Sequence, residues 1–498
     1  MRPRSSDKHD QLASGSGGVL TSVSLLLGAS EPALRLLFTI LLGYPLALIH
    51  RYFLFGKSAS IQHLYFIICG LTLGTFNYGS DILHSVFCVL VMYFLLLTIG
   101  GTFKSVVISF FFLMGYLIYG YYITGTDDYD IKWSMPQCVL TLRMIGLAYD
   151  VFDGQKPVEK LSNDQKKTAL KKCPSLLEVA GHTYFLEDLW WAHSRNSYNK
   201  RNRTLLIRQF PMKRYVNFID GNFPGKPLSG KPSCIGAGLK RLSSGILILS
   251  IYQLGNMFIP EKMLLSPEYE NFHLLKKLII LGLWGKIALF KYIACWLISE
   301  GSCIMTGMTY NGTDQDGNNQ WDGCANVKLW DFNTTTTFEG IIKSFNINTN
   351  LWAGQYVFKR LKFLGNRYIS QGATLLFLAI WHGLHSGYYM CFLLEFIVMY
   401  FEKDVESIFD TRLPKVKALL TQGALRIPVL IFLKIYVDIF MGYCLASFCL
   451  LSWSRYMQVY GSVYYSGHIL YFGWPFVSPV IKMLIPKARV KDEKNKSQ

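Results

Sequence analysis

Apolar stretches long enough to cross a lipid bilayer recur along almost the whole chain. A membrane-spanning helix needs roughly 17 to 25 such residues. Candidate runs lie near residues 32–50, 62–78, 81–99, 105–125, 132–150, 237–259, 274–300, 371–400, 425–452 and 460–485. Only 16% of the 498 residues are charged, against about a quarter in soluble proteins. The sequence therefore predicts an all-α polytopic membrane protein with about ten or eleven spans.

No long polar insert divides these runs, so residues 31–485 are expected to form one transmembrane domain. Residues 1–18 lack the continuous apolar core of a cleaved signal peptide, and residues 1–30 are predicted to be a disordered or amphipathic N-terminus. Residues 486–498 are predicted to be a cytosolic tail. Its Lys494 and Lys496 resemble the dilysine signal of endoplasmic reticulum membrane proteins, and an ordinary basic tail is the alternative.

The net charge is strongly positive, with 50 Lys and Arg against 32 Asp and Glu, hence 50 − 32 = +18. In a polytopic protein this excess is typical of cytoplasmic loops and of contact with anionic lipid headgroups. The basic clusters at 159–173 and 198–203 have no nucleic-acid-binding module around them. We therefore exclude nucleic acid as a partner. The oligomeric state stays open, a homodimer included.

Residues 300–350 are rich in Asn, Gly, Thr and Asp, so they cannot lie against lipid unless protein satisfies their backbone. A polar segment of this length in an apolar chain is usually functional. Cys303 and Cys324 could form a disulfide there if the segment is lumenal. Glycosylation at Asn202, Asn311 or Asn333 is left open, because sequons are common by chance.

An amphipathic helix is predicted over 351–370, with a basic edge formed by Lys359, Arg360, Lys362 and Arg367. If the tail is cytosolic and three spans follow Ser370, counting back from the tail places this basic helix in the lumen. That placement conflicts with the positive-inside rule. A re-entrant or partly buried helix would resolve the conflict, and we favour it.

His382, in the string "WHGLHSGYY", lies within a run that otherwise suits a spanning helix. An imidazole can act as a general base near neutral pH, and an idle polar group is costly in a membrane. Gly383 and Gly387 form a GxxxG spacing that admits a close approach of backbones. The alternative is a buried histidine that donates to a carbonyl.

His385 lies three residues further on, near the same face, so an HxxH metal site is an alternative. No carboxylate follows before Glu395 and no HExxH pattern occurs. We therefore predict no metal, and assign supporting roles to His385 and Trp381.

Asn346, Asn348 and Asn350 alternate in "SFNINTNLW". An amide NH2 can donate to a developing oxyanion, which complements a base in acyl transfer. Each asparagine could instead cap the following helix or line a turn.

The ordered strings "WDGCAN", "SFNINTNLW", "FKRLKFLGN" and "IWHGLHSGYY", with Asn346 and His382 36 residues apart, resemble the membrane-bound O-acyltransferase superfamily. Within it they are most similar to the lysophosphatidylcholine acyltransferase branch, the type five lysophospholipid acyltransferases. The likeness is dense from residue 282 to 473. Because residues 181–220 are more polar than expected for this branch, their helix boundaries are uncertain.

The resemblance implies about eleven transmembrane helices around a buried chamber, reached by acyl-CoA from the cytosol and by lysophospholipid from the bilayer. His382 would deprotonate the acceptor hydroxyl, usually sn-2, while Asn346 would hold the acyl carbonyl or oxyanion. Lys359, Arg360 and Lys362 are candidates for the CoA phosphates, or for headgroup contact. Asn350 and Trp352 would support the site. Acyl-CoA is a co-substrate, and no cofactor is expected.

The implied activity is acylation of lysophosphatidylcholine and related lysophospholipids in phospholipid remodelling, with a preference for polyunsaturated chains, in the endoplasmic reticulum membrane. One alternative is another acceptor, such as a sterol, diacylglycerol or a protein. The other is a polytopic transporter or scramblase, but the sequence shows no internal repeat of the kind that many transporters carry.

Overall fold

The structure is a computed structural model that describes residue 22 and residues 30–126, 131–185, 211–221 and 232–487. Within these ranges the chain forms helices and no β-strand, apart from one isolated bridge between Thr313 and Asn319. Residues 1–21 and 23–29 of the predicted N-terminal segment, the dilysine residues and Asn202 lie outside the described residues. The prediction of an all-α membrane protein is confirmed; the count of eleven spans stays a prediction.

The first half of the chain forms α3 (Glu31–Ile49), α4 (Ala59–Tyr78), α5 (Ile82–Ile99), α6 (Phe103–Thr124), α7 (Ser134–Gly154), α8 (Asn163–Thr168), α9 (Leu176–Thr183), α10 (Met212–Ile219) and α11 (Ile235–Phe258). The second half forms α12 (Pro267–Asn271), α13 (Leu274–Thr306), α14 (Leu329–Thr334), α15 (Phe338–Ser344), α16 (Ile347–Tyr356), the 3-10 helix η6 (Phe358–Leu364), α17 (Arg367–His382), α18 (Ser386–Thr411), α19 (Pro414–Thr421), α20 (Arg426–Leu450), α21 (Trp453–Ser462) and α22 (Ser466–Leu484).

Six of the described helical segments are long and apolar enough to cross a membrane: Glu31–Leu54, Ala59–Ile99, Phe103–Thr124, Ile235–Leu265, Leu274–Thr306 and Gly423–Leu450. Their outward faces carry large exposed apolar side chains, such as Phe94, Phe111 and Phe432. In contrast, α7 is buried on nearly every side. A helix buried on all sides needs apolar residues around its whole circumference, as a lipid-facing helix does. The apolar run of α7 therefore does not distinguish an internal helix from a membrane-spanning one.

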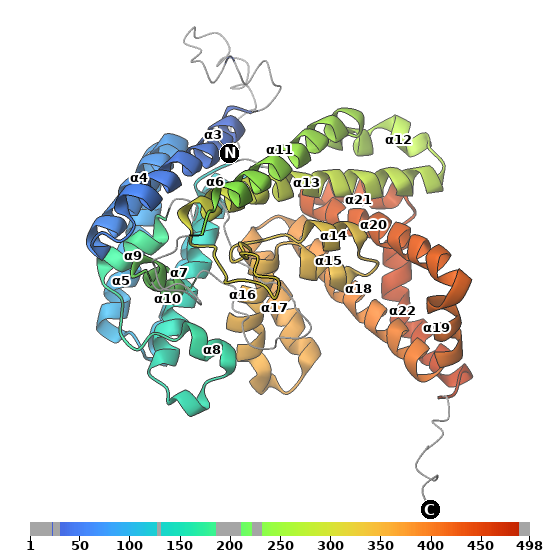
Figure 1. The fold of residues 1–498 in the computed structure, drawn as a ribbon. Helices are drawn as coiled ribbons and strands as arrows, with labels where there is room; N and C mark the ends of the chain where they lie inside the picture. Colours follow the sequence, from blue (N-terminus) through green and yellow to red (C-terminus); the bar gives the residue numbers. More distant parts are fainter. Residues whose placement is uncertain (1–21, 23–29, 127–130, 186–210, 222–231, 488–498) are drawn as a thin grey trace, which may run out of the picture.

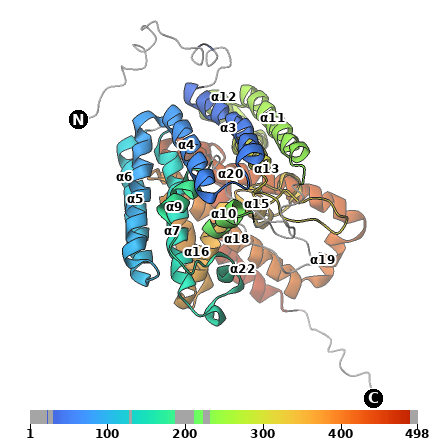
Figure 2. The same ribbon diagram turned by 60° about the vertical axis from the view of Figure 1, so that its left-hand side comes forward.

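Two hydrophobic cores lie side by side. The first unites α3 to α7, α9 and α10 with α16, α17 and the C-terminal end of α13. The second unites the rest of α13 with α15, α18 and α20 to α22. Figures 1 and 2 show the two groups of helices, with α11 and α13 lying across the top of Figure 1. The chain passes from one core to the other at the α15–α16 joint and returns at the α17–α18 joint.

The prediction of one span over 371–400 was wrong, because the chain breaks there into α17 and α18. Gly383 ends α17 with φ +141°, a conformation that side-chain-bearing residues rarely adopt. The helix therefore stops at His382, and a new helix starts at Ser386.

The predicted helix over 351–370 was also wrong. The chain leaves α16 at Val357, forms η6, and turns at Gly365 with φ +68° before Asn366 caps α17 through the backbone N–H groups of Tyr368 and Ile369. The basic residues therefore lie on a tight turn rather than along a helix face.

The α17–α18 hairpin removes the topological conflict. The ends of α18 and α22 are joined, since Arg412 donates to the carbonyl oxygens of Lys482 and Ile485, and Lys482 pairs with Asp404. Figure 1 shows α8, the turn before α17 and the end of α22 along its lower edge. Because α17 and α18 form a hairpin, the start of α17 and the end of α18 lie on the same side of the molecule. The basic turn before α17 therefore lies on the same side as the C-terminal end of the described chain.

Candidate active site

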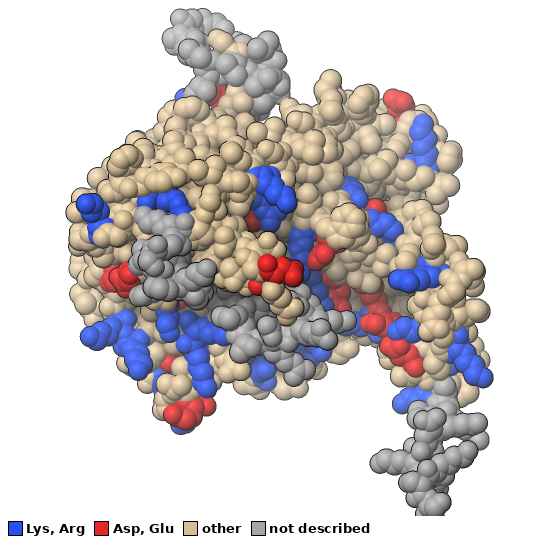
Figure 3. All heavy atoms as spheres, in the orientation of Figure 1, with Lys and Arg blue, Asp and Glu red and all other residues tan. Residues whose placement is uncertain are grey.

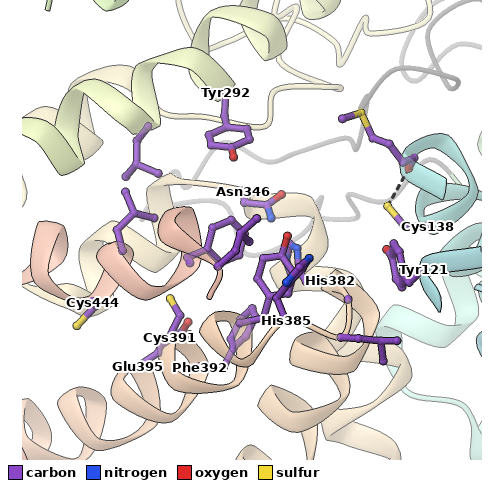
Figure 4. A pocket seen from close by; sticks show the side chains of 18 of the residues that line it. Tyr121, Cys138, Tyr292, Asn346, His382, His385, Cys391, Phe392, Glu395 and Cys444 are labelled. Carbon is purple, nitrogen blue, oxygen red and sulfur yellow. Dashed lines mark hydrogen bonds between the residues drawn. The ribbon is translucent and has the colours of Figure 1, made fainter. Parts of the chain in front are cut away.

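Asn346 and His382 face the same cavity. Its volume is about 500 Å³, and Asn346, Asn350, His382 and His385 all line it. Figure 4 shows Asn346 on one side and the two histidines on the other. Both residues stand at the joints between the two cores, so the cavity lies on the seam where helices of different cores meet.

The cavity is mainly apolar at one end and more polar at the other. Its apolar walls come from α13, α15, α18 and α20, and include Leu289, Phe345, Met441 and Phe448. Tyr121, Thr126, Lys132 and Ser134 line the more polar end near α6 and α7. A cavity of this kind suits an amphipathic molecule with a long apolar chain.

Aromatic rings hold His382. The ring centroids of Trp381, Phe448, Phe392 and Tyr388 lie 4.6, 5.0, 5.5 and 5.7 Å from the imidazole centroid. Among the described residues the imidazole has no hydrogen-bond partner in the protein. Its nitrogens are therefore left for a molecule in the cavity, as a general base requires.

Trp381 anchors the end of α17. Its indole Nε1–H donates to the carbonyl oxygen of Cys138 at 2.8 Å, and its own carbonyl accepts from the Tyr121 hydroxyl at 2.7 Å. These bonds tie the end of α17, and with it His382, to α6 and α7. The supporting role of Trp381 stays a prediction. His385 lines the cavity near Tyr388 but caps nothing with its side chain.

Gly387 lets α18 approach α20 closely. A Cβ atom there would lie 2.0 Å from the carbonyl oxygen of Ser447, which no real Cβ contact allows. This contact brings Phe448 of α20 against His382. The close approach expected from the glycine spacing is therefore present, although Gly383 serves instead to end α17.

The three alternating asparagines have separate tasks. Asn348 is fully buried and donates to Asn326, whereas Asn350 donates to the carbonyl oxygens of Ile342 and Phe345 at the end of α15. Asn346 holds the N-cap position of α16 with φ 44° and ψ 44°, yet its side chain makes no capping bond. The alternative that an asparagine caps the following helix therefore does not describe Asn346, and Asn350 instead closes the end of the preceding helix.

The start of α15 is fixed as well. The carboxylate of Glu402, on α18, accepts the backbone N–H of Phe338 at 2.9 and 3.0 Å and that of Glu339 at 3.4 Å. A carboxylate is favourable at a helix N-terminus. Glu402 therefore links the helix that follows His382 to the short helix that precedes Asn346.

The three basic candidates differ in their surroundings. Arg360 makes a two-pronged ion pair with the buried Asp153 at 3.0 and 2.5 Å, and Lys359 pairs with Asp164 at 2.5 Å. Lys362 is exposed and has no ion-pair partner among the described residues. Lys and Arg side chains gather at the lower left of Figure 3, around α8. Arg360 and Lys359 thus join the basic turn to α7 and α8.

Two further predictions concern single residues. Trp352 stacks on Phe377 with centroids 5.6 Å apart and is buried in the first core, outside the cavity lining. Cys303 and Cys324 are free thiols, as are the other nine cysteines. The described residues hold no group of three or more His, Cys, Asp or Glu side chains that could bind a metal.

Sequence reasoning missed the residues that surround Asn346 and His382. Phe448 and Tyr121 come from distant helices, and nothing in the local sequence marks them. Asn326 ends the string "WDGCAN", and the family resemblance assigns no role to this asparagine. Its position in a polar segment was the one available signal.

The sequence is similar to known acyltransferases over nearly its whole length. Residues 118–452 match the model of MBOAT, the membrane-bound O-acyltransferase family. "Lysophospholipid acyltransferase 5" of Mus musculus is 43% identical over 472 residues, which cover 94% of this chain and 93% of the relative. The protein of the same name in Drosophila melanogaster is 42% identical, covering 92% and 89%. The "Lysophospholipid acyltransferase" of Schizosaccharomyces pombe is 28% identical, covering 90% and 86%.

The matched region contains both Asn346 and His382, and the match to the relatives extends across both cores. With an amide and an imidazole converging in an apolar chamber, sequence and geometry agree: this chain belongs to the membrane-bound O-acyltransferase family.

Proposed function

We propose that the protein is an acyl-CoA-dependent lysophospholipid O-acyltransferase, with His382 as general base and Asn346 as the donor to the acyl carbonyl. The observation that carries this proposal is the convergence of the two side chains on one mainly apolar cavity. The relatives named lysophospholipid acyltransferase supply the substrate class. Membership of an acyltransferase family favours an enzyme over a transporter or scramblase.

In this mechanism His382 takes the proton of the free glycerol hydroxyl as that oxygen attacks the thioester carbon. The Asn346 NH2 donates to the carbonyl oxygen as negative charge develops on it. The new C–O bond forms, the C–S bond breaks, and the imidazolium returns the proton to the CoA thiolate. No acyl-enzyme is needed, because donor and acceptor meet in one cavity.

The direct test is transfer from labelled acyl-CoA to a panel of lysophospholipids in membranes that contain the protein. We expect acylation of lysophosphatidylcholine with a preference for polyunsaturated chains, and loss of transfer in His382→Ala. Diacylglycerol and a sterol serve as competing acceptors. Transfer only to these would replace the proposed acceptor, and full transfer by His382→Ala would contradict the mechanism.

Of the three basic candidates, Lys362 is the one we propose for the CoA phosphates, because Arg360 and Lys359 are already paired. A basic side chain near an anionic group contributes about 1 kcal/mol. We therefore expect Lys362→Gln to raise the KM for acyl-CoA about fivefold, with little change in kcat and a smaller effect at high salt. Arg455→Gln, on α21, is the control for a general loss of charge. An unchanged KM would assign Lys362 to headgroup contact.

We also propose residence in the endoplasmic reticulum membrane with the C-terminal tail in the cytosol. The support is the basic side chains on the face where α22 ends, together with Lys494 and Lys496. Protease protection of a C-terminal epitope in sealed microsomes tests the orientation. A protected epitope would place the tail in the lumen.

A further inference from the structure

We propose that Asn326 is a positioning residue that fixes which end of the Asn346 amide faces the cavity; the inference rests on the proposed function. Asn326 lies in the polar segment after α13 and is 4% exposed. Its side chain contacts both Asn346 and Asn348, at the start of α16. It does not line the cavity.

The orientation is set by a backbone group. The main-chain N–H of Asn348 can only donate, and it lies 3.1 Å from Oδ1 of Asn326. The Asn348 side-chain NH2 donates to the same oxygen at 2.6 Å. Because an amide has its oxygen and nitrogen on opposite prongs, the other prong of Asn326, which faces Asn346, must be the NH2.

That NH2 in turn sets Asn346. It lies 3.4 Å from Oδ1 of Asn346, and the Thr349 hydroxyl donates to the same oxygen at 3.0 Å. Two donors on one prong require an oxygen there, which leaves the Asn346 NH2 as the prong toward the cavity. Figure 4 shows this amide above His382. The backbone N–H of Asn348 thus fixes the orientation of the Asn326 amide, and the Asn326 amide fixes that of Asn346. As a result, Asn346 presents a donor to the substrate.

The same arrangement explains why Asn346 is available. An asparagine at the N-cap position usually accepts from the backbone two or three residues on. Here Asn326 does so instead, with its side-chain oxygen on Asn348 and its carbonyl oxygen on the N–H of Ile347 at 3.2 Å. The N-terminus of α16 is therefore capped by a residue of a different segment. The Asn346 side chain makes no capping hydrogen bond to its own helix.

The decisive variant is Asn326→Asp, which keeps a capping oxygen and replaces the NH2 by a second oxygen. The Asn346 amide would then turn its NH2 toward position 326 and its oxygen toward the cavity. We expect kcat to fall on the order of a hundredfold, the loss typical of one oxyanion donor. The KM for acyl-CoA should change little, while the new buried carboxylate lowers the unfolding temperature. A purely structural role would lower stability alone and leave the kcat of the folded protein unchanged.

Two comparisons isolate the route through Asn346. In an Asn346→Ala background, Asn326→Asp should cause no further loss, because residues that act as one unit are not additive. Thr349→Val should lower kcat less than Asn326→Asp does, and Thr349→Ser should restore it. If Asn326→Asp does not fold, the threonine pair decides, and an unchanged kcat in Thr349→Val overturns the inference.

The outcomes also separate this inference from the proposed function. Wild-type transfer that is lost in His382→Ala but retained in Asn326→Asp overturns the positioning role alone. Additive losses in the double variant also overturn it. The absence of wild-type transfer to any lysophospholipid overturns the proposed function, and the inference with it.

Discussion

The two sides of the cavity hold their reactive groups by different means. Asn346 is bound by directional hydrogen bonds from Asn326 and Thr349. His382 is held by four aromatic rings and has no hydrogen-bond partner among the described residues. One side is polar and specified atom by atom, whereas the other is apolar and specified by shape.

The difference follows from what each group must do in the proposed reaction. An amide has two unlike prongs, so only hydrogen bonds can decide which prong faces the substrate. An imidazole that takes up and returns a proton needs an accessible nitrogen throughout. Rings fix the plane of the imidazole without occupying that nitrogen. Each experiment below removes one of these means, in order of decreasing expected effect.

The largest effect is expected on the aromatic side. His382→Gln keeps a polar side chain of similar size but removes the base, and should lower kcat about a thousandfold, within the usual range for general base catalysis. Single-turnover rates with labelled acyl-CoA measure it. His385→Gln is the matched control, and we expect it to retain most of the activity. Comparable losses in both would contradict the separate roles of the two histidines.

On the polar side, Asn346→Ala removes the proposed carbonyl donor and should lower kcat about a hundredfold. Asn350→Ala provides the contrast, since its amide caps α15. That variant should lower the free energy of unfolding by about 1 to 2 kcal/mol. Its effect on kcat should be smaller than that of Asn346→Ala. Steady-state kinetics and thermal unfolding in detergent distinguish the two. The reverse pattern would exchange their roles.

The polar side continues beyond α16 to the Arg360–Asp153 pair. Arg360→Gln leaves the buried Asp153 carboxylate with Lys156 as its charged partner and Gln165 as a neutral donor. The loss of the two-pronged ion pair should lower the free energy of unfolding by about 3 kcal/mol. Burial raises the pKa of Asp153, but the hydrogen bonds and charge of Arg360 and Lys156 outweigh it and hold this pKa below its usual range.

Because the pKa is lower in the folded state, the pair stabilises the protein above the ordinary pKa of an aspartate, and this stabilisation is lost as pH falls through the lowered value. The difference in unfolding free energy between wild type and Arg360→Gln should therefore be full at neutral pH and shrink below about pH 4. Unfolding curves at several pH values measure it. A difference that grows toward acid pH would contradict the assignment.

The smallest effect concerns the aromatic rings. Phe448→Ala removes the edge-on ring 5.0 Å from His382, and should lower kcat about tenfold, because a less well placed base reacts more slowly. Phe448→Tyr, which keeps the ring, should retain most of the activity. Equal activity in Phe448→Ala and wild type would show that the remaining rings suffice.

Much of the fold was predictable because each membrane-spanning helix is marked by its own local run of apolar residues. The predicted runs near 62–78, 81–99 and 237–259 agree with α4, α5 and α11 to within a few residues. The prediction failed at 371–400, where the composition is that of a span but Gly383 adopts a conformation that ends the helix. Residues 351–370 failed for a related reason, since amphipathic spacing does not reveal the turn at Gly365.

The candidate site was predictable only in part. His382 and Asn346 could be proposed because polar side chains stand out in an apolar chain and match a family motif. Their positioning partner Asn326 could not, because a buried asparagine in a polar segment looks like any loop residue. The pairing of Arg360 with Asp153, 207 residues away, was likewise invisible.

By itself, the sequence determined the class of protein, the order of the helices and the two side chains on which the proposed chemistry depends. These are properties of composition and local spacing, which do not depend on how distant parts of the chain pack together. The tertiary structure alone decided that both joints lie on the seam between two cores, and which prong of Asn346 faces the cavity. These depend on contacts between residues far apart in the chain, and such contacts exist only once the helices have packed.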